Sequence, residues 1–170
     1  MKVIRKDEAT AVSCVVNGER VSGSCEPRTL LTDFLRHEIG ATGVHVGCEH
    51  GVCGACTILL NGRSVRACLT FAVQAQGADI ETVEGLSLDG AALSDLQAAF
   101  RKRHALQCGF CTPGILISMT QLLTEEPMVT EDRVRDVLSG HLCRCTGYEG
   151  IVDAVLDVAA QRAHEESEPA

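Results

Sequence analysis

The sequence predicts an α+β protein in which a small mixed sheet with one helix precedes four further helices. Two Asn-Gly pairs, Asn17-Gly18 and Asn61-Gly62, each separate short strand-like runs, which is a strong local signal for a two-residue hairpin. After Val83 the β-branched alternation stops, and apolar residues recur at helical spacing. The expected division is a first domain, a helical domain and a flexible tail, over residues 1–84, 85–165 and 166–170.

Each element of the first half has its own local signal. A hairpin is expected over residues 11–24, followed by a helix over residues 29–39 with its apolar residues on one face. Gly40 stands where a helix C-cap would. A second hairpin is expected over residues 57–67, and residues 80–83 are expected to add one more strand.

Four helices of modest length are expected in the second half, and together they suggest a compact bundle. They are expected over residues 91–104, 112–123, 130–138 and 148–163, after a linker at 84–90. Thr112 and Thr130 are the expected N-caps of two of these helices, because a threonine hydroxyl can accept a bond from the first turn. The chain after Ala163 is expected to fray.

The composition excludes several classes of protein. A net charge of −8 on 170 residues gives no basic surface for nucleic acid. No run reaches the roughly 18 apolar residues that mark a membrane span, and the N-terminus has no signal-peptide pattern. Ten cysteines therefore point to metal binding, because disulfides are rare in a reducing compartment. We expect a cytoplasmic metalloprotein.

The first group of four cysteines has the spacing of a plant-type [2Fe–2S] ferredoxin. It consists of Cys48, Cys53, Cys56 and Cys68. Glycines between residues 43 and 54 would let the backbone wrap closely and turn its N–H groups toward the negatively charged cluster. A structural zinc site is the alternative, although zinc loops more often use two short cysteine pairs. Because four cysteines complete the shell, His45 and His50 are expected to be solvent-facing loop residues.

The second group of four cysteines consists of Cys108, Cys111, Cys143 and Cys145. Each half of it precedes an expected helix, where free backbone N–H groups are available to the sulfurs. Taken alone this spacing also suits zinc, but beside a ferredoxin-type loop it favours a second [2Fe–2S] cluster. Arg144 lies between two ligands, where it raises the cluster's potential, pairs with a partner's carboxylate, or is simply solvated. Cys14 and Cys25 are left over and are expected to be small core or surface residues.

Three stretches of the chain closely resemble the small iron–sulfur subunit of molybdenum hydroxylases. They are Gly47–Thr57, Gln107–Gly114 and His141–Tyr148, within a similarity that runs from about Val12 to Ala160. That family includes xanthine dehydrogenase, aerobic carbon monoxide dehydrogenase and the bacterial quinoline, nicotine and aldehyde oxidoreductases. The resemblance implies a plant-ferredoxin-like β-grasp domain followed by a four-helix bundle domain, with all eight cysteines ligating two [2Fe–2S] clusters.

The resemblance also implies partners for an electron-transfer chain that has no catalytic residue of its own. A large subunit would hold a molybdenum–molybdopterin cofactor, often as the cytosine dinucleotide, and a medium subunit would hold FAD, in a heterotrimer that pairs into a dimer. The cluster of the second cysteine group would lie nearest the molybdenum, the other toward the flavin, and Gln107 and Cys145 would contact the pterin. A freestanding ferredoxin-type carrier and a zinc-stabilised binding module are the alternatives. The substrate stays open.

Overall fold

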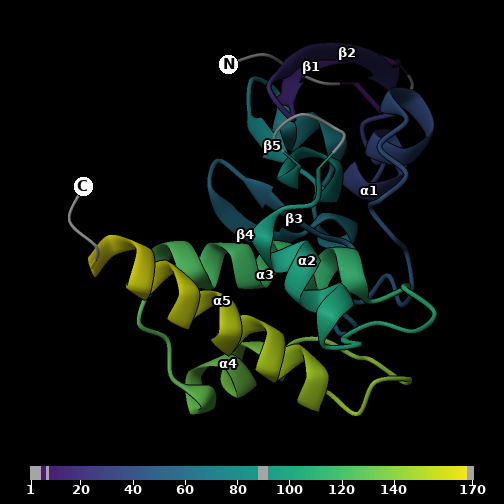
Figure 1. Ribbon diagram of the computed structural model, residues 1–170. Helices are drawn as coiled ribbons and strands as arrows, with labels where there is room; N and C mark the ends of the chain where they lie inside the picture. The colour runs from purple at the N-terminus through teal and green to yellow at the C-terminus, as the bar shows by residue number, and fades with distance from the viewer. Residues whose placement is uncertain (1–4, 7, 88–91, 168–170) are drawn as a thin grey trace.

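The computed structural model describes residues 5–6, 8–87 and 92–167. These residues form one five-stranded sheet and five α-helices, which confirms the expected combination of a sheet with a set of helices. Figure 1 shows the sheet and α1 in one half of the molecule and α2 to α5 in the other. The bounds are β1 (Thr10–Val16), β2 (Glu19–Cys25), α1 (Leu31–Asp33), β3 (Thr57–Leu60), β4 (Arg63–Arg66), β5 (Asp79–Glu81), α2 (Asp95–Lys102), α3 (Thr112–Glu125), α4 (Glu131–Leu138) and α5 (Glu149–Ser167).

Both hairpins form where the Asn-Gly pairs predict them. Asn17 and Gly18 adopt φ angles of 51° and 82°, and Asn61 and Gly62 adopt 52° and 78°. Positive φ at both central residues is the geometry of a type I′ turn, which Asn and Gly accept most easily. The expected further strand is β5, which lies parallel to β1 and antiparallel to β3 and so joins the two hairpins in the order β2-β1-β5-β3-β4.

The helix expected over residues 29–39 begins later than predicted, and most of it is a π-helix, which is wider than an α-helix. Only Leu31–Asp33 is α-helical, and Phe34–Ile39 continues as a π-helix that ends, as expected, at Gly40 with φ of 86°. The start is late because Leu30 forms a β-bridge with Phe71, so its backbone is in an extended conformation.

The four helices expected in the second half are confirmed, with shifted ends. Ser94 caps α2 by accepting from the Gln97 N–H, and the Gln97 side chain accepts from the Ser94 N–H, which fixes the start at Asp95. The earlier start expected at Ala91 lies outside the described residues. Thr130 caps α4 as predicted, since its Oγ1 accepts from the Arg133 N–H.

Two expectations about helix ends are wrong. Thr112 is the first helical residue of α3 rather than its N-cap, which is Cys111, and the Thr112 hydroxyl has no hydrogen-bond partner among the described residues. The last helix, α5, does not fray after Ala163 but continues to Ser167. None of the described helices is long and apolar enough to cross a membrane.

Two separate apolar cores hold the fold together. One lies between the sheet and α1 and includes Phe34, Ile58 and Ile80, and it takes up Cys14 and Cys25 as small core residues, as expected. The other lies among α2 to α5 and is centred on large side chains that include Phe100, Met119 and Ile151. Leu59 of β3 belongs to this second core, because α3 packs against β3. The sheet and the helices therefore meet along α3, close to the cysteine loops.

Candidate metal centres

The first group of cysteines lies in the loop before β3 and in the short turn after β4. Cys56 and Cys68 are buried, whereas Cys48 and Cys53 are half-buried. The backbone N–H groups of Cys53 and His50 each donate to Cys48 Sγ at 3.4 Å, and these bonds lower the pKa of Cys48 to about 6. The loop thus turns N–H groups toward a sulfur, as the sequence predicts for an anionic cluster.

The second group lies at the starts of two helices. Cys111 is the N-cap of α3, and Cys108 precedes it in the same turn. Cys143 and Cys145 lie in the turn between α4 and α5, which brings Cys145 Sγ within 3.6 Å of Cys108 Sγ. The Thr146 hydroxyl lies 3.1 Å from Cys143 Sγ, and Cys111 lies beside Cys143. All four thiols therefore come together from positions up to 37 residues apart in the sequence.

The thiols of each group are arranged in twos. Close pairs are Cys48 with Cys53, Cys56 with Cys68, Cys108 with Cys145, and Cys111 with Cys143. Two thiolates on one tetrahedral metal lie about 3.7 Å apart when each metal–sulfur bond is about 2.3 Å, and Cys108 Sγ and Cys145 Sγ lie 3.6 Å apart. Among the described residues, no three His, Cys, Asp or Glu side chains could hold one metal ion. Two pairs per site fit a binuclear [2Fe–2S] cluster better than a single zinc ion, which takes four ligands.

Burial sets the acidity of the inner thiols. It raises the pKa of Cys56 to about 11 and that of Cys111 to about 12. These thiols are protonated at neutral pH until a metal replaces the proton, so loading of either site would release protons.

Gln107 and Cys145, expected from the resemblance to contact a pterin, are brought together. The Gln107 side-chain amide donates from Nε2 to the backbone oxygen of Cys145 at 2.9 Å. Gln107 is exposed and Cys145 is half-buried, so both can be reached from outside the chain.

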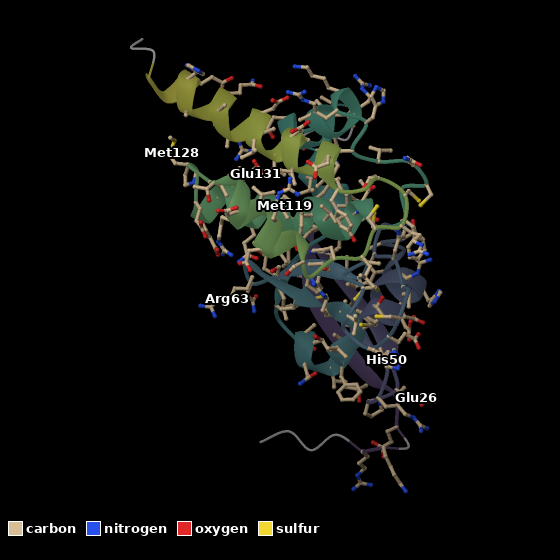
Figure 2. The ribbon with its side chains drawn as sticks, turned by 90° about the horizontal axis from the view of Figure 1, so that it is seen from below. Glu26, His50, Arg63, Met119, Met128 and Glu131 are labelled. Atoms are coloured by element: carbon tan, nitrogen blue, oxygen red, sulfur yellow. The ribbon has the colours of Figure 1, made fainter. Side chains whose placement is uncertain are left out.

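The two cysteine loops touch each other directly. The Leu142 N–H donates to the Cys53 backbone oxygen at 3.0 Å. Gly54 packs so closely that a Cβ there would lie 2.3 Å from His141 Nδ1. Figure 2 shows several sulfur atoms along the edge of the molecule where His50 lies, away from Arg63 and Met128.

Two histidines, His45 and His141, make contacts that the sequence does not indicate. His45 is a half-buried loop residue rather than a fully solvent-facing one. Its ring stacks on Phe110 with 5.0 Å between the ring centres, and its Nδ1 donates to the Phe110 backbone oxygen at 2.8 Å. His141 is buried, with Nε2 2.8 Å from Ser118 Oγ. Burial and then the charge of Arg66 lower the pKa of His141 to about 4, so it is neutral. His50 is exposed, as expected, and bonds back to the Cys48 carbonyl.

Two iron–sulfur families match adjoining parts of the chain. The sequence model of the family described as 2Fe-2S iron-sulfur cluster binding domain matches residues 14–87, and that of the family described as [2Fe-2S] binding domain matches residues 82–156.

Individual relatives match over nearly their whole length. The nicotine 6-hydroxylase small subunit of Paenarthrobacter nicotinovorans is 57% identical over 146 residues, which are 86% of this chain and 87% of that protein. The caffeine dehydrogenase subunit gamma of Pseudomonas sp. (strain CBB1) is 50% identical, over 87% of this chain and 90% of that protein. The crystal structure of quinoline 2-oxidoreductase from Pseudomonas putida 86 superposes with a TM-score of 0.88 at 52% identity, covering 95% of this chain and 99% of that one.

Proposed function

The chain belongs to the family of small iron–sulfur subunits of molybdenum hydroxylases, and from this premise we propose that it relays electrons between two partner subunits through two [2Fe–2S] clusters. The observation that carries the proposal is the gathering of eight thiols into two adjoining sites, each made of two close pairs. Each cluster, when bound, takes up and gives back one electron at a time. The chain itself holds, orients and shields the two sites.

The eight ligands divide between two proposed domains. The ligands of the first cluster are Cys48, Cys53, Cys56 and Cys68, in a plant-ferredoxin-like β-grasp domain over residues 1–84. The ligands of the second are Cys108, Cys111, Cys143 and Cys145, in a four-helix domain over residues 85–165. The two separate apolar cores and the two family matches, which overlap only at residues 82–87, support this division.

The proposed partners follow from the family. A large subunit would hold the molybdenum–molybdopterin cofactor, often as the cytosine dinucleotide, and a medium subunit would hold FAD, in a cytoplasmic dimer of heterotrimers. Gln107 and Cys145 would contact the pterin, because both lie at the outer side of the second site and are already bonded to each other. The second cluster would then lie nearest the molybdenum and the first cluster nearest the flavin.

The native assembly tests this proposal. We expect about four irons per small chain, no stoichiometric zinc, two distinct electron paramagnetic resonance (EPR) signals on reduction, and two larger chains that co-purify. A single paramagnetic centre, or none, would contradict the two-cluster proposal. A native mass equal to that of this chain alone would favour a freestanding carrier instead.

Arg144 gives a first prediction about potentials. Its side chain is exposed and has no ion pair among the described residues, although it lies between Cys143 and Cys145. A nearby positive charge favours the reduced cluster, so Arg144→Ala should lower the midpoint potential of the second cluster. The free energy of its one-electron reduction should change by less than about 1 kcal/mol. A redox titration followed by EPR measures this, with the first cluster as internal reference. An unchanged second midpoint would remove the electrostatic role.

A further inference from the structure

Arg66 is a half-buried cation that has no anionic partner among the described residues. It ends β4, two residues before Cys68. Its Nη1 donates to Thr57 Oγ1 at 2.5 Å and its Nη2 donates to the Gly140 backbone oxygen at 2.6 Å, both neutral acceptors. Within the described part of the chain, no carboxylate lies within 4.0 Å of it, whereas Arg103, for example, is paired with Asp157. A cation withdrawn from water without an anion is costly, so an anion is expected nearby.

The two acceptors of Arg66 lie next to the cysteine loops of the two different metal sites. Thr57 is buried, follows Cys56 directly, and donates its own hydroxyl hydrogen to the Gly54 backbone oxygen in the first loop. Gly140 begins the segment that leads to Cys143, and that segment continues the contact through His141 against Gly54. One guanidinium therefore joins the loop of the first site to the loop of the second.

We propose that Arg66 is a shared counter-cation of the two iron–sulfur sites, which raises both reduction potentials and holds the 140–143 segment against the first loop. This inference rests on the proposed function, since the anions it invokes are the two clusters. Four thiolates around two ferric ions and two sulfides leave each oxidised cluster with negative charge, and reduction adds one more. A fixed positive charge therefore stabilises the reduced form more than the oxidised form. We expect the larger effect at the first site, because Arg66 precedes Cys68 by two residues and its acceptor Thr57 directly follows Cys56.

The test is an EPR-monitored redox titration of the whole complex with Arg66→Gln. We expect the midpoint potentials of both clusters to fall. At the first cluster the equilibrium constant for reduction should fall about tenfold, which lowers its midpoint potential by about 59 mV for one electron. Arg66→Lys keeps the charge, so both midpoints should lie nearer to those of the parent. Arg63→Gln is the matched control: it removes an equal charge from the other end of β4, where the side chain is exposed and lies away from the sulfur atoms (Figure 2), and it should move neither midpoint.

The outcomes separate this inference from the proposed function. Unchanged midpoints in Arg66→Gln, or equal shifts in the Gln and Lys variants, overturn the role of Arg66 while two EPR signals still support the relay. Fewer than two signals in the parent complex overturn the relay itself. If the Gln variant fails to load its clusters, Arg66→Lys decides. A single ammonium keeps the charge but does not reproduce the guanidinium fork, so at the first cluster the equilibrium constant for reduction should fall by less than the tenfold expected for the Gln variant. An unchanged first midpoint, or a fall of tenfold or more in that constant, overturns the inference.

Discussion

Replacing Cys111 with alanine should remove one complete cluster and leave the other in place. Cys111 is buried at the start of α3 beside Cys143, so its loss leaves a half-empty pair with no other thiol within the second site to fill it. Iron should fall from about four to about two atoms per chain, and one of the two EPR signals should vanish.

A matched control for this change exists in the same chain. Cys14 is as deeply buried as a ligand, but it lies in the core beneath the sheet. Cys14→Ala makes the same chemical change and should keep all the iron. Retention of four irons in Cys111→Ala, or an equal loss in Cys14→Ala, would contradict the ligand assignment.

Gly54→Ala should be strongly destabilising, although Gly54 is not a proposed ligand. Gly54 has φ of 78°, and an added Cβ would lie 2.3 Å from His141 Nδ1 and 2.9 Å from the Gly140 backbone oxygen. The left-handed backbone alone costs alanine about 1–2 kcal/mol, and forcing a methyl group into a packed site costs typically a further 1–3 kcal/mol. Urea unfolding of the loaded chain measures the sum.

Gly62→Ala separates strain from contact. Gly62 also has φ of 78°, but an added Cβ would meet nothing within 4 Å. The two variants therefore share the backbone strain, and the difference between their unfolding free energies measures the contact between the loops. Adding His141→Ala to Gly54→Ala should recover part of that difference. Equal destabilisation by the two glycine variants would show that the contact of Gly54 with Gly140 and His141 accommodates the extra methyl group with no loss of stability.

Local chemistry made much of the fold predictable. Both hairpins follow from Asn-Gly pairs, whose preferred turn needs no help from the rest of the chain. The helix over residues 29–39 was placed correctly but its start was not, because the pairing of Leu30 with Phe71 is a contact between distant segments. Thr112 looked like a cap, yet the turn that brings Cys111 to the metal site places Cys111 in the cap position.

The candidate sites, like the fold, could be predicted only in part. The two groups of cysteines could be found by spacing, because ligand loops repeat a fixed local geometry. The contacts between the groups could not, since His45 meets Phe110 across 65 residues and Arg66 meets Gly140 across 74. No single-sequence pattern reports such a meeting, so the sequence predicts two sites but not the residues that couple them.

The uneven burial of the second site has a consequence for biosynthesis. Cys108 is exposed whereas Cys111 is buried, so the proposed site has an open side and a closed side. A preformed cluster delivered by another protein can arrive only through the open side, which is also the side where Gln107 would meet the cofactor of the large subunit. In the proposed assembly the large subunit covers this open side, so the second cluster would have to be in place before that subunit binds.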